Sequence, residues 1–152
     1  MKVSVNFMHN EKRVQQAVAA FMEGKSWSQA VFCVYGPALG IAEEAALRIS
    51  GAFGGGMGNL SEACGAATGA FMAIGAKGLP KEETYKLVQA FAKEFQAKYG
   101  SLHCTNLLGF DLSTENGREG RKNSGLGHEY CAQYVQGAAE ILEKLLFSEA
   151  TK

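Results

Sequence analysis

Apolar residues recur every three or four positions along most of the chain, a spacing typical of helices that bury one face. Serine, proline and glycine residues mark the ends of these segments. The predicted helices span residues 10–24, 26–36, 42–49, 59–76, 80–100 and 128–147. The pattern contains no convincing strand pair, internal repeat or linker. We therefore expect one compact all-α domain over residues 1–152, a bundle of about five to six helices, with residues 1–9 as a short N-terminal arm.

Local signals place two cysteines on predicted helices. A serine and a glutamine three positions apart form a capping-box pattern, and the helix that follows carries Cys33. A similar pattern begins at Asn59 and puts Cys64 in the second turn of its helix. One or two helical turns are expected around Cys104. Residues 109–127 are rich in Gly, Asn, Ser and charged residues, which is typical of a long surface loop.

Glycine is over-represented and gathers beside Cys64. The 19 glycines among 152 residues are about 12%, against an average of roughly 7%. Residues 51–58 hold so many of them that we expect an irregular loop before the Cys64 helix. Gly65 and Gly69 are four positions apart, which leaves one helix face without side chains. This face suits either a closely packed second helix or the close approach of a cofactor.

The charge balance and the apolar runs argue against two classes of function. Basic and acidic residues both number 15, so the formal net charge is zero. Without a basic surface, binding to nucleic acid or to anionic lipid is not expected. The longest apolar run, 63–76, is shorter than the roughly 20 residues that cross a membrane. The first ten residues contain no apolar segment of signal-peptide length, so we expect a cytoplasmic protein without membrane insertion.

The four cysteines lie on separate predicted elements. Cys33, Cys64, Cys104 and Cys131 are 31, 40 and 27 residues apart. This spacing matches no local zinc or haem motif, and structural disulfides are not the default in a chain of this kind. Metal binding, redox chemistry and simple packing as small apolar side chains all remain open.

Three features favour chemistry over packing. Cys64 is predicted near a helix N-terminus, where the helix dipole favours a thiolate. His103 directly precedes Cys104. His128 lies about one helical turn before Cys131. Either imidazole is a candidate metal ligand or a modifier of thiol pKa values.

Taken in order, the motifs are SQAV with Cys33, the glycine stretch 51–58, CGAATG at 64–69, FQAKYGSLHCTNLLG ending at Gly109, and Cys131. This combination, over about residues 26–145, resembles the C_GCAxxG_C_C family of redox-active proteins. Members of the family are small helical domains, and a related domain in split-Soret cytochromes is associated with an iron–sulfur cluster held by cysteines. The resemblance implies a redox or cluster-binding role for all four cysteines, with Gly65 and Gly69 allowing close approach beside Cys64. A Cys-x-x-Cys-His haem attachment is absent from the chain, so no haem and an external redox partner protein are expected.

Four hypotheses follow. The leading one is that the four cysteines converge on a 2Fe-2S cluster for electron transfer, since such a cluster takes four ligands. The second is a thiol–disulfide oxidoreductase that pairs Cys64 with a resolving cysteine, with Cys64 and Cys33 as the predicted catalytic residues. The third is zinc bound by cysteines, with or without His103 or His128. The fourth is a helical interaction domain whose cysteines only pack. The relatives suggest a homodimer, although a bundle of this size can also stand alone.

Overall fold

The protein is all-α, as the sequence predicts. The computed structural model describes residues 2–148, with side chains described from residue 11 onward. The helices are α1 (Lys2–Met22), α2 (Trp27–Ala38), α3 (Glu43–Ser50), α4 (Gly54–Met57), α5 (Gly65–Ala76), α6 (Lys81–Tyr99), α7 (Cys104–Leu108), α8 (Glu115–Asn123) and α9 (Ala132–Leu142). A 3-10 turn at His128–Cys131 precedes α9, and a π-helical turn at Glu143–Phe147 follows it. These are more helical segments than predicted, mainly because α8 was expected to be loop. α4 is a short turn in which Gly55 and Gly56 do not have right-handed helical backbone angles.

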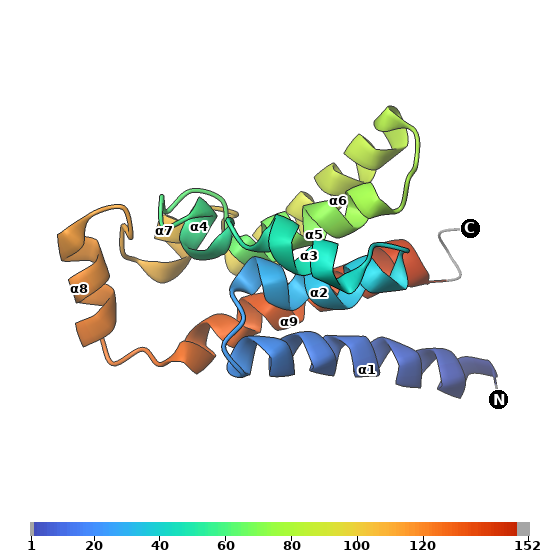
Figure 1. Cartoon of the computed structure of the whole chain (residues 1–152), viewed down its shortest axis with the longest axis horizontal. Coiled ribbons are helices and arrows are strands. Elements are labelled where there is room, and N and C mark those ends of the chain that lie inside the picture. Colours follow the sequence, from blue (N-terminus) through green and yellow to red (C-terminus); the bar gives the residue numbers. More distant parts are fainter. Residues whose placement is uncertain (1, 149–152) are drawn as a thin grey trace.

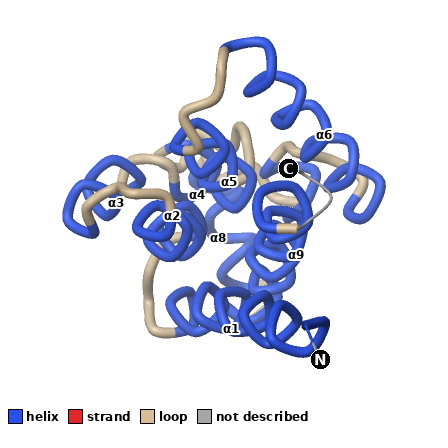
Figure 2. The backbone as a smooth tube through the Cα atoms, turned by 90° about the vertical axis from the view of Figure 1, so that its right-hand side faces the viewer, coloured by secondary structure: helices blue, strands red, loops and turns tan. Residues whose placement is uncertain are grey.

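The core lies where α2 and α9 run through the middle of the molecule. α2 packs against α1, α3 and α5, and α9 packs against α1, α5 and α6. Figure 1 shows α1 running below α9, with the α5–α6 pair above, and Figure 2 shows the same layers end-on. The largest fully buried aromatic side chains are Phe21, Tyr35, Phe91 and Phe95. Within the described residues, no helix combines the length and the apolar character needed to cross a bilayer.

The start of α2 confirms the capping prediction. The Ser26 hydroxyl accepts a hydrogen bond from the Gln29 backbone N–H at 3.4 Å. The Gln29 side chain in turn accepts one from the Ser26 backbone N–H at 3.2 Å. Both bonds satisfy N–H groups that have no partner inside the helix. α2 therefore begins as predicted and carries Cys33.

The beginnings of α1 and α5 differ from prediction. α1 begins at Lys2, so residues 2–9 continue the helix and form no separate arm. Asn59 does not start a helix, because it has a left-handed backbone with φ of 63°. α5 begins only at Gly65, with Cys64 as its N-cap residue. Residues 62–64 form backbone hydrogen bonds with residues 102–104 instead, so the helix begins after Cys64.

The predicted loop 109–127 contains the helix α8. Its N-cap residue is Thr114, whose hydroxyl accepts a hydrogen bond from the Gly117 N–H at 2.9 Å. None of the residues of α8 is buried. A helix without a buried face carries no apolar period, so the sequence pattern could not reveal it.

The glycine face of α5 packs directly against α2. A Cβ atom added at Gly69 would lie 2.7 Å from the Ser28 carbonyl oxygen, and one added at Gly65 would lie 2.9 Å from Trp27 Cβ. Both distances are far shorter than ordinary contacts, so these positions need glycine. Of the two roles expected for this face, close helix packing is the one that the structure contains, and it fixes the start of α5 beside Trp27.

Candidate functional site

Three of the four cysteines line one small cavity, which we call the thiol pocket. Cys64, Cys104 and Cys131 border a cavity of about 10 Å³. Their exposed fractions are 5%, 7% and 1%. The other lining residues are Trp27, Gly55, Gly56, Gly65, Leu107, Leu108 and Tyr134. Segments far apart in sequence thus bring three thiols together in the interior.

Each of these cysteines sits at the beginning of a helix. Cys64 is the N-cap residue of α5, and Cys131 is the N-cap residue of α9. Cys104 is the first residue of α7. The N-terminal ends of α5 and α9 carry partial positive charge, and the N–H groups of Ala66 and Ala67 bond to the Cys64 thiol. These helix starts oppose the effect of burial, which disfavours negative charge on sulfur.

Backbone hydrogen bonds hold the Cys64 and Cys104 segments side by side. The Cys64 N–H donates to the Leu102 carbonyl at 2.8 Å, and the Cys104 N–H donates to the Glu62 carbonyl at 2.6 Å. Ala63 and His103 form an isolated antiparallel bridge between the same segments. These bonds explain how a residue before α5 and one at the start of α7 come to share a cavity.

A left-handed turn forms another wall of the pocket. The residues with positive φ are Gly55 (65°), Gly56 (70°), Met57 (68°), Gly58 (63°) and Asn59 (63°). This conformation costs most residues other than glycine and asparagine roughly 1–2 kcal/mol, so Met57 is strained. A Cβ atom at Gly56 would lie 2.7 Å from Cys104 Cβ. The glycine segment, expected to be irregular, is thus an ordered turn that presses its backbone against a cysteine.

Burial raises the pKa values of all three pocket thiols. Burial raises the pKa of Cys64 to about 12, and proximity to Cys104 and Cys131 adds to the rise, while the N–H groups of Ala66 and Ala67 oppose it. For Cys104, burial outweighs the opposing effect of the Ser61 hydroxyl on its pKa. The expected lowering of the Cys64 pKa by the helix start is therefore wrong, because desolvation outweighs the N–H groups.

The pKa of Cys131 rises for the same reason but is held back by two neighbours. Burial is the largest cause, and the guanidinium of Arg121 and the indole of Trp27 lower the pKa. Nη2 of Arg121 lies 3.8 Å from Cys131 Sγ. In the metal-free protein the pocket thiols are protonated at neutral pH. A thiol in this state is a poor nucleophile.

Cys33 lies elsewhere. It is half-buried on α2 and does not line the thiol pocket. Burial raises its pKa, and Lys25, Ser50 and Glu43 are the neighbours that modify it. All four cysteines are free thiols. The structure therefore brings together three of the four predicted site cysteines and leaves Cys33 against α3.

The two candidate histidines do not line the pocket either. The His103 ring lies 3.1 Å from a Glu62 carboxylate oxygen and is exposed. The His128 ring stacks on Phe21, with 4.0 Å between the ring centroids, and bonds to the Phe21 carbonyl oxygen at 2.9 Å. Each imidazole thus has a partner outside the pocket.

The donor set of the pocket suits a soft metal, but the pocket is closed. Cysteine sulfurs are the ligands that iron–sulfur clusters and zinc prefer, and three of them line this pocket beside glycine backbone. Across the described residues, however, no group of three or more His, Cys, Asp or Glu side chains is close enough to hold a metal ion as the chain stands. A cavity of about 10 Å³ has room for about one water molecule. The chemistry of the residues fits such a group, and binding requires the pocket to open.

Two residues at the pocket were not identified as site residues from the sequence. Trp27 and Tyr134 both line the cavity. Arg121, near Cys131, was also missed. The sequence holds one usable signal, because Trp27 directly follows the capping serine of α2. Arg121 offered no signal, since it lies in a polar stretch ten residues before Cys131.

Comparison with known families settles which group this chain belongs to. Residues 26–145 match the family described as "Putative redox-active protein (C_GCAxxG_C_C)". The chain belongs to this family. The match contains all of Cys33, Cys64, Cys104 and Cys131 and most of the described fold. Searches of curated proteins and of solved structures found no significant match.

Proposed function

We propose that this C_GCAxxG_C_C protein is an electron carrier whose redox centre is an iron–sulfur cluster held by Cys64, Cys104 and Cys131. The observation that carries this proposal is the meeting of three buried thiols around one cavity. When bound, the cluster supplies one-electron chemistry at sulfur-ligated iron. The protein accepts an electron from one partner protein and passes it to another.

The surroundings of the thiols support an anionic centre. Thiolates bound to iron carry net negative charge, and the starts of α5 and α9 offset it. Arg121 adds a full positive charge 3.8 Å from Cys131 Sγ. The Trp27 indole also approaches this sulfur. Together these groups favour sulfur in its charged, metal-bound form, whereas burial keeps the metal-free thiols neutral.

The predicted set of four cysteine ligands needs revision in this proposal. A 2Fe-2S cluster takes four ligands, and the pocket offers three thiols. Cys33 is turned toward the residues around Ser50 and contributes to no shared cavity with the others. We therefore assign Cys33 no ligand role and leave the fourth position to a ligand other than cysteine.

A thiol–disulfide cycle receives less support from the pocket. An attacking cysteine needs a thiolate at working pH, and the pKa of Cys64 rises to about 12. The predicted partner Cys33 does not share the pocket with it. Zinc remains the competing occupant, because its preference for thiolates is the same.

The test is to purify the full-length chain without oxygen, record its visible spectrum and quantify iron, zinc and acid-labile sulfide in one sample. The proposal predicts visible absorption with iron and sulfide in matched amounts. Replacing Cys104 with serine should abolish both. The control is the wild-type chain reconstituted with iron and sulfide under reducing conditions.

Three results would contradict the proposal. Zinc without iron would assign a zinc site instead. A disulfide between two pocket cysteines in the purified protein, with no metal before or after reconstitution, would favour the thiol–disulfide cycle. Four free thiols without any metal, again after reconstitution, would mean that the cysteines only pack in the core.

A further inference from the structure

The walls of the thiol pocket differ in how firmly they are held. On one side, α5 meets α2 so closely that a Cβ at Gly69 would lie 2.7 Å from the Ser28 carbonyl oxygen. On a second side, the left-handed turn is tied to α7, because Thr105 Oγ1 lies 3.1 Å from the Ser61 carbonyl oxygen and 2.8 Å from its hydroxyl. Opening either wall breaks buried contacts, which close-packed interiors resist.

Residues 109–127, which we call the α8 arm, do not line the cavity, but Arg121 of the arm contacts the pocket residue Cys131. The arm begins five residues after Cys104 and ends four residues before Cys131, so pocket cysteines flank both its ends. α8 buries none of its residues. Figure 1 shows it at the far left, joined to the body by loops. Segments with few buried contacts open at a low free-energy cost. The start of the arm is anchored, because Leu112 is buried and its N–H donates to the Ser61 hydroxyl at 3.0 Å. α8 itself is therefore the part of the pocket's surroundings best able to move.

Arg121 connects this arm to the pocket. Its guanidinium donates hydrogen bonds to the Leu126 carbonyl and, at 3.2 Å, to the Gly127 carbonyl. The same side chain places Nη2 3.8 Å from Cys131 Sγ. A single residue thus bonds to the chain where the arm rejoins the body and to a pocket sulfur.

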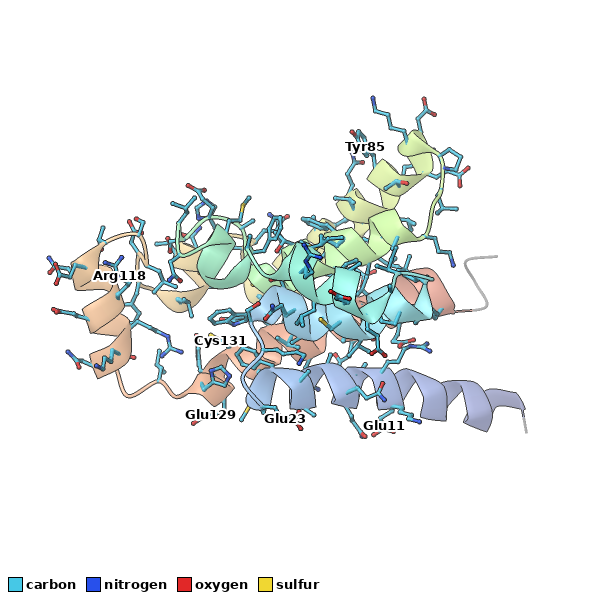
Figure 3. All side chains as sticks on the ribbon, viewed as in Figure 1. Glu11, Glu23, Tyr85, Arg118, Glu129 and Cys131 are labelled. Carbon is cyan, nitrogen blue, oxygen red and sulfur yellow. The ribbon has the colours of Figure 1, made fainter. Side chains whose placement is uncertain are left out.

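A second arginine on the same helix provides a comparison. Arg118 donates to the Leu112 carbonyl at 2.9 Å, a contact inside the arm. Figure 3 shows Arg118 on α8, well away from Cys131, which lies where the arm rejoins the body. The two arginines carry the same charge on one helix, but of the two, Arg121 is the one that reaches the thiol pocket.

The contact between Arg121 and Cys131 depends on the charge of the sulfur. A guanidinium bonds weakly to a neutral thiol and much more strongly to a thiolate, because charge-assisted hydrogen bonds are about twice as strong as neutral ones. A thiolate bound to a soft metal keeps part of its negative charge. Occupation of the pocket therefore strengthens the contact that holds the arm down.

We propose that Arg121 is a positioning residue that fastens α8 to the Cys131 side of the thiol pocket when the pocket thiolates hold a soft metal or cluster, and that α8 swings away to load and release this occupant. The proposal rests on the proposed function of the pocket. It assigns Arg121 no contact with electrons or with a redox partner.

The experiment uses reduced full-length protein and cobalt(II) as a probe of thiolate binding, with the wild type, Arg121→Gln, Arg121→Lys and the matched control Arg118→Gln. Thiolate-to-cobalt absorption reports binding, and its decay after addition of a chelator reports release. Hydrogen–deuterium exchange over residues 109–127, with and without cobalt, reports closure of the arm. Circular dichroism and urea midpoints confirm that every variant folds.

We expect cobalt to slow exchange in the arm of the wild type and of Arg118→Gln. Arg121→Gln should bind the same amount of cobalt, release it about tenfold faster and show no cobalt-dependent protection of the arm. Arg121→Lys should fall between the two, because it keeps the charge but loses the forked contact with the carbonyls.

Two results would overturn the proposal, and they differ in what else they affect. Equal release and equal arm protection in Arg121→Gln and the wild type would refute the role of Arg121 alone. A wild type that shows no thiolate-to-cobalt absorption would refute the metal-binding pocket and, with it, the fastening of α8 beside it.

Discussion

The α2–α5 crossing and the α8 arm both adjoin the thiol pocket, yet they are built in opposite ways. At the crossing, Ser28 is fully buried against the glycine face of α5. In the arm, α8 has no buried residue and is held by a side-chain cap at Thr114 and by the two arginines. This difference underlies our proposal that the tight crossing holds the thiols in place while α8, through Arg121, controls access to them.

The largest effect on stability should come from adding a side chain at the tight α2–α5 crossing. Gly69→Ala adds a methyl group where only 2.7 Å separates it from the Ser28 carbonyl oxygen. Overpacking of this kind costs about 3 kcal/mol at its upper range, and urea unfolding measures it. Gly75→Ala on the same helix is the matched control, since a Cβ there meets nothing within 4 Å. It should stabilise the protein by about 0.5–1 kcal/mol. Equal effects of the two changes would show that the crossing is not tightly packed.

The next effect concerns the burial of the Cys64 thiol, which should make the stability of the metal-free, reduced protein depend on pH. The pKa of Cys64 rises from 9.0 to about 12 on folding, so the folded chain holds this proton where the unfolded chain has lost it. The contribution of Cys64 to the free energy of unfolding is therefore fully present below pH 9. It falls by about 1.4 kcal/mol per pH unit as the pH rises toward 12. Urea midpoints between pH 8 and 10.5 measure the slope. Cys64→Ser should reduce it, and an unchanged slope would mean that Cys64 is not desolvated.

The smallest effect on global stability should come from the exposed helix α8. Thr114→Ala removes the hydroxyl that accepts from the Gly117 N–H, and loss of such a cap weakens a helix by about 1 kcal/mol. Because α8 buries no residue, hydrogen exchange should speed up in α8 while the global free energy of unfolding changes by less than about 0.5 kcal/mol. Thr114→Ser keeps the hydroxyl and serves as the control. A large loss of global stability would show that the arm is part of the core.

The same contrast explains what the sequence could predict. Helices with one buried face were found from their apolar period, and the capping box of α2 was found from Ser26 and Gln29. α8 has no buried face, so no apolar period marks it. The start of α5 was misplaced because the hydrogen bond from Cys64 to the Leu102 carbonyl joins segments far apart in sequence, and local capping rules do not contain such pairings.

The candidate site was predicted in part for similar reasons. The order of motifs singled out all four cysteines, but what Cys33 contacts depends on how α3 packs against α2. The pKa of Cys64 was predicted in the wrong direction, because the helix start is visible in sequence and burial to 5% exposure is not. Arg121 came to the pocket through the folding of the arm, which no local pattern describes.

The central claim is that three thiols, and not four, form the redox centre. The most direct test is to replace each of the four cysteines with serine in turn and to measure iron and acid-labile sulfide per chain after identical anaerobic reconstitution. The account predicts wild-type amounts in Cys33→Ser and strong losses in Cys64→Ser, Cys104→Ser and Cys131→Ser. Loss of iron and sulfide in Cys33→Ser equal to that in the other three would contradict it and restore a centre with four cysteine ligands.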